Sequence, residues 1–368
     1  MTRVSAVGEQ TSLADRKRRA GQRLVIGFAG PAVDDDLRDL VREIQPAGFV
    51  LFARNVVEPA QVRELNRELA SLVPSSHPAL LAVDQEGGRV QRIREPATRW
   101  PAMGVVGRAG TEATAEVSRA MALELIDMGF NLNFAPVADV NSNPKNPVIG
   151  DRSFGDKSGP VSGCVASFVE AHQAAGLGAC IKHFPGHGDT SVDSHHALPV
   201  VERELPDLEH TELPPFAAGI AAGVGAVMSA HVVFPALDEE HPATLSDRVL
   251  PSLLRDRLGF DGLVFTDDME MKAVHGRYPI ADQVARATAA SIDVMLVCET
   301  RDLQFAFFQE LVRLQERRPH DTASEDSARR VMRWRERFIR LPRPTRDMAH
   351  VGARRHRDMA HELLERWA

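Results

Sequence analysis

The chain has 368 residues, of which 43% are hydrophobic and 26% are charged, and its formal net charge is −7 at pH 7. This composition is typical of a soluble globular protein with a sizeable core, and the acidic balance gives a nucleic-acid partner no electrostatic support. The local basic run Arg16–Arg19 follows the candidate helix cap Ser12 and is interpreted as a solvated helix face.

The cysteines and the apolar segments indicate the cellular compartment in which the protein is expected. Cys164, Cys180 and Cys298 are odd in number, widely spaced and mostly set in apolar runs, which predicts buried free thiols in a reducing compartment. The N-terminus lacks the pattern of a signal peptide, and the longest segment of small apolar residues, Ala217–Ala230, is too short to span a bilayer. We therefore expect a cytoplasmic protein without a membrane partner.

Short apolar runs alternate with amphipathic segments along the chain, and the alternation repeats. We expect strands at Leu24–Phe28, Gly48–Phe52, Leu80–Val83, Leu132–Ala135, Gly178–Ile181, Ala226–Ser229, Gly262–Phe265 and Val294–Val297. We expect the following helices at Asp35–Ile44, Pro59–Leu72, Ala113–Met128, Val161–Ala175, Pro214–Ala222, Leu250–Leu258, Ala281–Ser291 and Leu303–Gln315. Strands that are each followed by a helix predict an α/β protein with a single (β/α)8 TIM-type barrel rather than a doubly wound sheet.

The barrel is expected to span residues 20–318, after a polar N-terminal segment at residues 1–19. Residues 319–368 are expected to form a C-terminal helical extension, in which the helix Ser327–Ile339 packs outside the barrel. The tail repeats Arg-Asp-Met-Ala-His at residues 346–350 and 357–361, a spacing of about three helical turns. This spacing predicts that Met348 and Met359 share one face of a helix as a packing stripe.

Polar residues recur where the expected strands end. The carboxyl ends of successive strands are where such barrels assemble a site, although some of these side chains are expected to cap the next helix instead. The residues concerned are Arg54, Asn55, Asp84, Asp139, His183, His231 and Asp267.

The segment from Lys182 to His195 carries the strongest functional signal in the chain. It contains three histidines, two aspartates, a lysine and two glycines directly after the apolar run Gly178–Ile181. Clustered ionisable groups must be paired or solvated, and glycines lose the most entropy on folding. Such a segment at a strand end predicts a functional site rather than a structural connector.

Four segments, taken in order, closely resemble the β-N-acetylglucosaminidase branch of glycoside hydrolase family 3. They are Val83–Arg92, Ile149–Phe154, Lys182–Gly188 with the downstream Asp193-Ser194-His195, and Phe260–Met269. The resemblance covers about residues 20–300 and implies a (β/α)8 barrel, in agreement with the alternation of elements.

The resemblance also implies an activity. It is that of a retaining exo-β-N-acetylglucosaminidase of cytoplasmic peptidoglycan recycling, which removes terminal N-acetylglucosamine from 1,6-anhydro-muropeptides. It implies no metal and no organic cofactor, and a small carbohydrate as the substrate. We expect the enzyme to act as a monomer. Aromatic residues are only 5% of the chain, which favours a short pocket for one terminal sugar over a long cleft.

The resemblance implies that Asp267, at the end of the seventh strand, is the nucleophile. A carboxylate can attack the anomeric carbon and leave again, which divides one difficult displacement into two easier ones. The neighbouring Asp268 points to the opposite side if the strand continues, so it is interpreted as a support or a cap.

The resemblance further implies that His195 is the general acid/base and that Asp193 orients it. An imidazole has an ordinary pKa of about 6.5, so it can donate and accept a proton near neutral pH without deep burial. A carboxylate on one ring N–H fixes the tautomer and favours the imidazolium. His187 is expected to shape the loop by hydrogen bonds, and His231 is a candidate lining residue.

Sugar hydroxyls require charged donors and acceptors. By resemblance, Asp84 and Arg92 bind sugar hydroxyls, and Arg152, Lys182 and His183 complete the pocket. A lysine at the end of an apolar strand is hard to explain as a purely structural residue, because burying an unpaired charge is costly.

Three other functions would use parts of the same residue set. A metal-dependent hydrolase would use His183, His187, Asp189 and His195 as ligands, but the first strand ends in Gly27–Gly30 without a His-x-His pair. A non-catalytic sugar-binding barrel would need neither a nucleophile nor a proton donor. A β-N-acetylglucosaminide phosphorylase stays open, because a His–Asp dyad repels incoming phosphate less than a bare carboxylate does.

Overall fold

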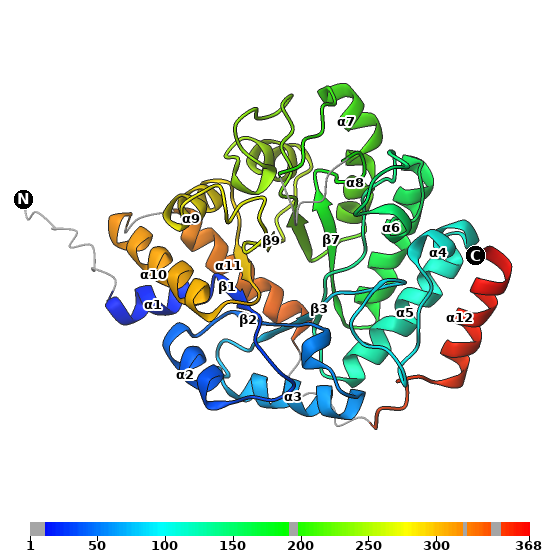
Figure 1. The fold of residues 1–368 in the computed structure, drawn as a ribbon, viewed down its shortest axis with the longest axis horizontal. Helices are drawn as coiled ribbons and strands as arrows, with labels where there is room; N and C mark the ends of the chain where they lie inside the picture. The colour runs from blue at the N-terminus through cyan, green and yellow to red at the C-terminus, as the bar shows by residue number, and fades with distance from the viewer. Residues whose placement is uncertain (1–11, 191–197, 319–321, 340–346) are drawn as a thin grey trace, which may run out of the picture.

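The computed structural model describes residues 12–190, 198–318, 322–339 and 347–368. Within these residues, parallel strands close into a barrel in which each strand pairs with its neighbours along the chain (Figure 1). The predicted (β/α)8 barrel is therefore confirmed. Its strands are β1 (Leu24–Ile26), β2 (Gly48–Leu51), β3 (Leu80–Val83), β6 (Leu132–Asn133), β7 (Gly178–Phe184), β8 (Ala226–Ser229), β9 (Leu263–Asp268) and β10 (Val294–Val297).

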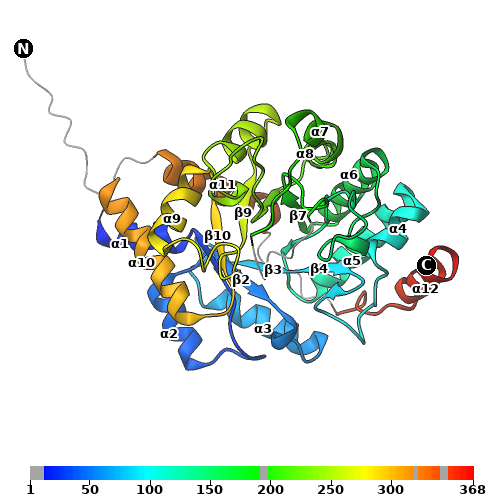
Figure 2. The same cartoon turned by 45° about the horizontal axis from the view of Figure 1, so that its top comes forward.

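Helices surround the barrel on its outside, as the tilted view shows (Figure 2). The expected helices around the barrel are present, with ends within three residues of the prediction. They are α2 (Asp35–Ile44), α3 (Pro59–Ser71), α5 (Thr111–Asp127), α6 (Ser158–Ala174), α8 (Leu213–Ala221), the π-helical η4 (Leu250–Arg257), α9 (Ile280–Ala289) and α10 (Arg301–Arg317). The helix expected after Ser12 is present as α1 (Leu13–Gly21). The structure adds α4 (Met103–Ala109), α7 (Leu205–Thr211) and a hairpin of β4 (Gln85–Gly87) with β5 (Val90–Gln91).

Local sequence explains why these helices form where they do. In α1, Ser12 accepts a hydrogen bond from the backbone N–H of Asp15, so the expected cap is confirmed. In α2, Asp34 caps the first turn through the backbone N–H of Leu37, at 2.8 Å. The apolar residues of α2 recur at helical spacing and are all buried, so one face of the helix packs against the barrel.

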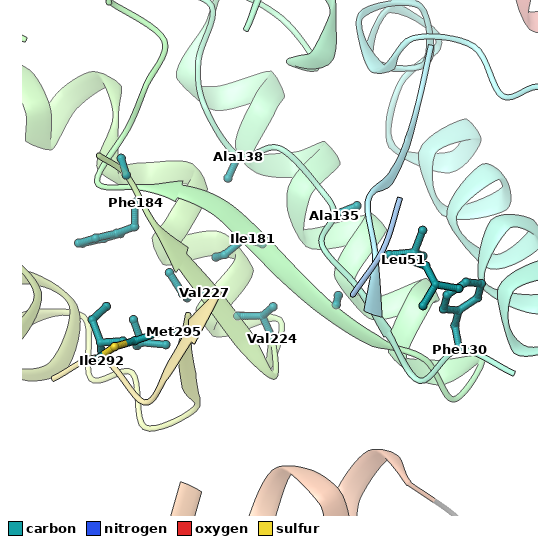
Figure 3. Packing of buried hydrophobic residues seen from close by; sticks show 14 of the residues in the cluster. Leu51, Phe130, Ala135, Ala138, Ile181, Phe184, Val224, Val227, Ile292 and Met295 are labelled. Carbon is teal, nitrogen blue, oxygen red and sulfur yellow. The ribbon is translucent and has the colours of Figure 1, made fainter. Parts of the chain in front are cut away.

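The core has two layers because strand residues alternate between the two sides of the barrel wall. Leu24 and Ile26 belong to the layer between strands and helices, whereas Val25 belongs to the interior layer. Figure 3 shows part of the outer layer, with Ile181 on β7 and Val227 on β8. Parallel strands with both faces covered bury nearly all their residues, which accounts for the continuous apolar runs in the sequence.

The helix α11 (Thr322–Phe338) closes the amino-terminal end of the barrel. Trp334 and Phe338 pack against the interior layer, and a Cβ added at Gly178 would lie 2.4 Å from Cζ2 of Trp334. Arg335 is buried and donates to the backbone carbonyls of Ala47 and Pro78, just before β2 and β3. The expected helix near Ser327–Ile339 is thus present, but it closes one end of the barrel and completes its core instead of packing outside it. The boundary at residue 318 stays a prediction.

The tail ends in α12 (Arg354–Trp367), and here one expectation is wrong. Met348 lies in a turn before this helix, so only Met359 is helical and the two methionines share no helix face. The interruption is at Gly352, whose φ of +59° is incompatible with a continuous right-handed helix. Among the residues that the structure describes, no helix combines the length and apolarity needed to cross a membrane.

Candidate active site

One end of the barrel collects the polar side chains that the sequence places after its strands. This is the carboxyl end, as expected for the site of such a barrel. The contributing residues are Asp84 after β3, Glu86 in β4, Asp139 after β6, Lys182 and His183 in β7, His231 after β8, and Asp267 and Asp268 in β9.

Two carboxylates and two cations form an interlocked network on one wall of this end. Lys182 Nζ lies 2.7 Å from Oδ1 of Asp84 and 2.6 Å from Oε1 of Glu86. Arg152 donates from Nε and Nη2 to the two oxygens of Glu86, at 2.7 and 2.8 Å. A bidentate arginine fixes the orientation of its partner, so the network presents Asp84 and Lys182 in a defined geometry.

The network keeps its members charged. Burial by itself raises the pKa of Glu86, but Arg152 and Lys182 outweigh burial and hold this pKa far below its usual range. Burial lowers the pKa of Lys182, and Asp84 and Glu86 more than compensate, so its pKa is raised. At neutral pH these side chains therefore present fixed charges to a ligand, and no side chain has to move or change its protonation state.

Arg92 lies beside this wall with unused hydrogen-bonding capacity. Its Nη2 is 3.5 Å from Oδ2 of Asp84, and its guanidinium lies over the Phe52 ring, 5.5 Å from the centroid. Among the described residues, its buried Nε has no hydrogen-bond partner. A buried donor without a partner is costly, so this nitrogen calls for a partner that the described residues do not supply.

Asp139 organises the start of the histidine-rich loop. Its carboxylate accepts hydrogen bonds from the backbone N–H of His183, at 3.1 Å, and of His187, at 2.7 Å. It also lies 2.8 Å from Nδ1 of His183. This contact places the proton on Nδ1 and leaves Nε2 of His183 for another partner.

His187 has the structural role expected for it. Its Nδ1 lies 2.7 Å from Oγ1 of Thr190, and burial lowers its pKa to about 4. His231 likewise supports its surroundings, since its Nδ1 meets Thr244 at 2.9 Å and its Nε2 meets the carbonyl of Asp268 at 3.1 Å. His231 therefore contacts the backbone of β9 at Asp268, next to Asp267.

Asp267 is a partly exposed carboxylate at the end of β9. It is two residues beyond Phe265, so it shares the side of the strand that faces the barrel interior. Burial raises its pKa, but His183, His231 and a 2.8 Å hydrogen bond from the backbone N–H of Asp268 outweigh burial and lower it. Asp267 is thus ionised at neutral pH.

Asp268 differs from its neighbour in environment. Burial raises its pKa to about 7, and its Oδ1 accepts hydrogen bonds from the backbone N–H of Glu270, at 3.1 Å, and of Cys298, at 3.3 Å. This geometry agrees with the interpretation of Asp268 as a support. Adjacent carboxyl groups with pKa values pushed apart are a common feature of catalytic sites.

The predicted dyad Asp193 and His195 lies outside the described residues. The segment that leads to it is firmly anchored: Asn146 Nδ2 donates to the carbonyls of His187 and Gly188, at 2.8 and 2.9 Å. Asp189 accepts from Nε of Arg203 at 2.7 Å.

These features agree with the comparison to protein families, in which the model for the glycosyl hydrolase family 3 N-terminal domain matches residues 17–334. The chain belongs to glycoside hydrolase family 3. A β-hexosaminidase from Xylella fastidiosa (strain M23) is 42% identical over 282 residues, which are 75% of this chain and 83% of that protein.

Solved structures of family 3 enzymes share this fold. The β-N-acetylglucosaminidase from Paenibacillus sp. str. FPU-7 superposes with a TM-score of 0.88 at 36% identity, over 95% of this chain and 68% of that one. NagZ from Neisseria gonorrhoeae, in complex with N-trifluoroacetyl-D-glucosamine, gives 0.71 at 30% identity, over 84% of this chain and 97% of that one. Together with the family match, these findings make the chain a glycoside hydrolase, a β-N-acetylhexosaminidase.

Two residues of this family 3 site were not singled out as site residues by sequence reasoning, namely Glu86 and Asp139. Glu86 is two residues beyond Asp84, so an extended backbone places both carboxylates on one side, which is a usable signal. Asp139 was noted only as a polar residue after a strand, and its contact with His183 spans 44 positions.

Proposed function

We propose that this family 3 enzyme is a retaining exo-β-N-acetylglucosaminidase that forms a covalent glycosyl-enzyme on Asp267. The observation that carries the proposal is the ionised carboxylate of Asp267 beside His183, His231 and Lys182 at the carboxyl end of the barrel. Such a carboxylate can bond to the anomeric carbon while the bond from that carbon to the aglycone oxygen breaks.

His195 supplies the proton in this mechanism. In the first step its imidazolium protonates the leaving aglycone oxygen, and Asp193 holds the ring in the required tautomer. In the second step the neutral imidazole takes a proton from water as the water oxygen attacks the anomeric carbon. In the same step the bond from that carbon to Asp267 breaks, and the β-configured sugar leaves.

The sugar hydroxyls are bound by the charged wall. Asp84 is positioned to accept hydrogen bonds, and the unpartnered Nε of Arg92 is positioned to donate one. Lys182 and Arg152 hold Asp84 and Glu86 in place, and His183 offers Nε2 because Asp139 occupies its Nδ1. These side chains are thus preorganised to bind several hydroxyls of one sugar ring.

The proposed substrate is terminal β-linked N-acetylglucosamine on peptidoglycan fragments, in particular 1,6-anhydro-muropeptides. The scarcity of aromatic platforms, at 5% of the chain, supports removal of one terminal sugar over binding of a long chain. We place the enzyme in the reducing cytoplasm, which is supported by three cysteines that are all free and buried. We expect it to act as a monomer, which light scattering of the purified enzyme checks.

The test compares an N-acetylglucosaminyl anhydro-muropeptide with chitobiose and with an aryl β-glucoside, each with and without phosphate. We expect release of free N-acetylglucosamine fastest from the anhydro-muropeptide and no effect of phosphate. Faster turnover of chitobiose would overturn the proposed aglycone. Sugar 1-phosphate as the product would show the phosphorylase that the sequence leaves open.

A further inference from the structure

The turn before α12, and α12 itself, dock on the helices beside the active-site hairpin. Figures 1 and 2 both place α12 next to α4 and α5. His356 and Leu363 are buried in this contact, and the turn approaches so closely that a Cβ added at Gly352 would lie 2.0 Å from the carbonyl oxygen of Pro96. At the far end, Nε of Arg108 donates to the carbonyl of Trp367 at 2.8 Å.

The buried carboxylate of Glu124 is one of two on α5 that hold this tail, the other being Asp127, which accepts from His350. Oε1 of Glu124, on α5, accepts hydrogen bonds from Nδ1 of His356 at 2.9 Å and from the backbone N–H of Gly352 at 3.3 Å. The same carboxylate accepts from Oγ1 of Thr98 at 2.5 Å and from its backbone N–H at 3.1 Å. Two donors therefore come from the tail and two from the segment that follows the hairpin.

The tautomer of His356 is fixed by its other neighbour. Nε of Arg355 donates to Nε2 of His356 at 3.3 Å, so Nε2 is the acceptor and Nδ1–H donates the hydrogen bond to Glu124. The Trp100 ring lies against His356, with centroids 5.8 Å apart. The tail thus contacts Trp100 directly and is linked to Thr98 through Glu124.

Thr98 and Trp100 in turn hold the hairpin that carries Arg92. Gln91 Nε2 donates to the carbonyl of Thr98 at 2.8 Å, and Gln91 Oε1 accepts from the backbone N–H of Trp100 at 3.1 Å. Gln85 Oε1 accepts from the backbone N–H of Arg92 at 3.0 Å. Buried hydrogen bonds therefore lead from His356 through Glu124 and Thr98 to Gln91. Gln91 and Gln85 both donate to the carbonyl of Ile93, which connects this series to the hydrogen bond at the backbone of Arg92.

We infer that the C-terminal segment belongs to the sugar-binding apparatus, with His356 acting through Glu124 and Thr98 as a positioning residue for Arg92. The inference rests on the sugar contact of Arg92 proposed above. Without the His356 donor, the buried carboxylate of Glu124 keeps only its hydrogen bonds from Gly352 and Thr98, and any shift of Thr98 that follows is transmitted to Gln91 and Arg92.

The test measures kcat and KM for an aryl β-N-acetylglucosaminide in His356→Leu, which removes the donor at similar volume. We expect KM to rise about 10-fold with little change in kcat, because substrate contacts are displaced while Asp267 is untouched. His356→Asn places an amide N–H where Nδ1 stood and is expected to restore KM to within about 3-fold of the parent value.

Two variants of the same helix separate positioning from stability. Leu363→Ala weakens the docking of α12 without touching Glu124, so it is expected to lower Tm and leave KM unchanged. His361→Leu, at an exposed position, serves as the control for losing a histidine. Should His356→Leu not fold, Thr98→Val removes a donor from the hairpin side of Glu124 and is expected to raise KM equally.

A second experiment makes the His356→Leu substitution in an enzyme that already lacks the Arg92 side chain. In Arg92→Ala, which by itself raises KM, adding His356→Leu is expected to have no further effect on KM. An equal rise in both backgrounds, or a lower Tm with unchanged KM in His356→Leu, would overturn the positioning role alone. If Arg92→Ala leaves KM unchanged, the sugar contact of Arg92 fails, and the inference fails with it.

Discussion

Asp139 holds the imidazole of His183 by a contact of 2.8 Å between its Oδ2 and Nδ1 of the ring, at the end of β7. The pKa of Asp139 is lowered, since His183 and His187 outweigh the effect of burial. The aspartate is therefore an acceptor at all pH values at which the enzyme is expected to work. It leaves Nε2 of His183 for the proposed contact with the sugar.

Replacing Asp139 by Asn should disturb this arrangement. We expect Asp139→Asn to reduce kcat/KM by about 10- to 100-fold, mostly through KM, because a charge-assisted hydrogen bond and the preferred tautomer are lost together. Steady-state kinetics checks this. Asp39→Asn, which loses an exposed ion pair with Arg42 on α2, is the matched control. Unchanged kcat/KM in Asp139→Asn would remove His183 from the proposed pocket.

The nucleophile assignment predicts a sharp separation of turnover from binding. We expect Asp267→Ala to abolish turnover and to leave binding of N-acetylglucosamine measurable by calorimetry. The neighbouring Asp268→Asn keeps the nucleophile and is expected to retain much more activity. Substantial residual turnover in Asp267→Ala would contradict the assignment of Asp267 as the nucleophile.

The acid/base assignment predicts a dependence on the leaving group. We expect His195→Ala to lose on the order of 10²–10⁴ in kcat with a poorly activated aglycone. The loss should be much smaller with an activated aryl aglycone, which leaves without protonation. Kinetics on both substrates checks this, and equal losses on the two would contradict a general-acid role.

A buried glutamate beneath the histidine-rich loop predicts a dependence of stability on pH. Glu212 lies against Gly186, its Oε1 meets Oγ of Ser142 at 3.2 Å, and burial followed by the charge of Asp139 raises its pKa to about 8. Its ordinary pKa is 4.5. Between these values the folded protein keeps a proton that the unfolded chain releases. The stability contributed by this group is therefore complete below pH 4.5 and is lost as the pH rises to about 8.

Glu212→Gln removes this titration. Relative to the variant, the parent enzyme should lose up to about 1.4 kcal/mol of unfolding free energy per pH unit within that window. Urea unfolding at several pH values between the two pKa values measures the difference. The exposed Glu202→Gln is the control. A difference between parent and Glu212→Gln that is independent of pH would contradict the account.

The closure of the barrel by α11 predicts a large loss of stability. Trp334 is buried against Gly178 and Gly225, where its ring leaves no room for a Cβ. We expect Trp334→Ala to reduce the free energy of unfolding by about 3–5 kcal/mol. Arg333→Ala on the exposed face should cost far less. Equal losses in the two variants, measured by chemical unfolding, would show that the helix does not complete the core.

Much of the fold can be predicted from the sequence because local pattern and burial coincide there. The apolar run Leu80–Val83 and the amphipathic segment Asp35–Ile44 match β3 and α2 residue by residue. The position at which α11 packs on the barrel and the turn at Gly352 cannot be predicted from local pattern, because both depend on contacts between distant parts of the chain.

In the site, too, the sequence predicts some residues and misses the contacts between distant positions. The motifs place Asp84, Lys182, His183 and Asp267 at strand ends, and the closed barrel brings these residues together at its carboxyl end. The pairing of Glu86 with Arg152 joins positions 66 residues apart, and the interlocking of both with Lys182 follows only from the closed barrel. A sequence indicates which charges exist, but their partners depend on the tertiary fold.

The most direct test of the account is to identify the residue that carries the sugar. The enzyme would be incubated with a 5-fluoro N-acetylglucosaminyl fluoride, which forms a glycosyl-enzyme faster than water removes it. Mass spectrometry of the intact and digested protein would follow. The account predicts one added sugar residue per chain, on the peptide that contains Asp267, and none in Asp267→Ala. A label on another residue, or turnover through an inverted product without any covalent adduct, would contradict it.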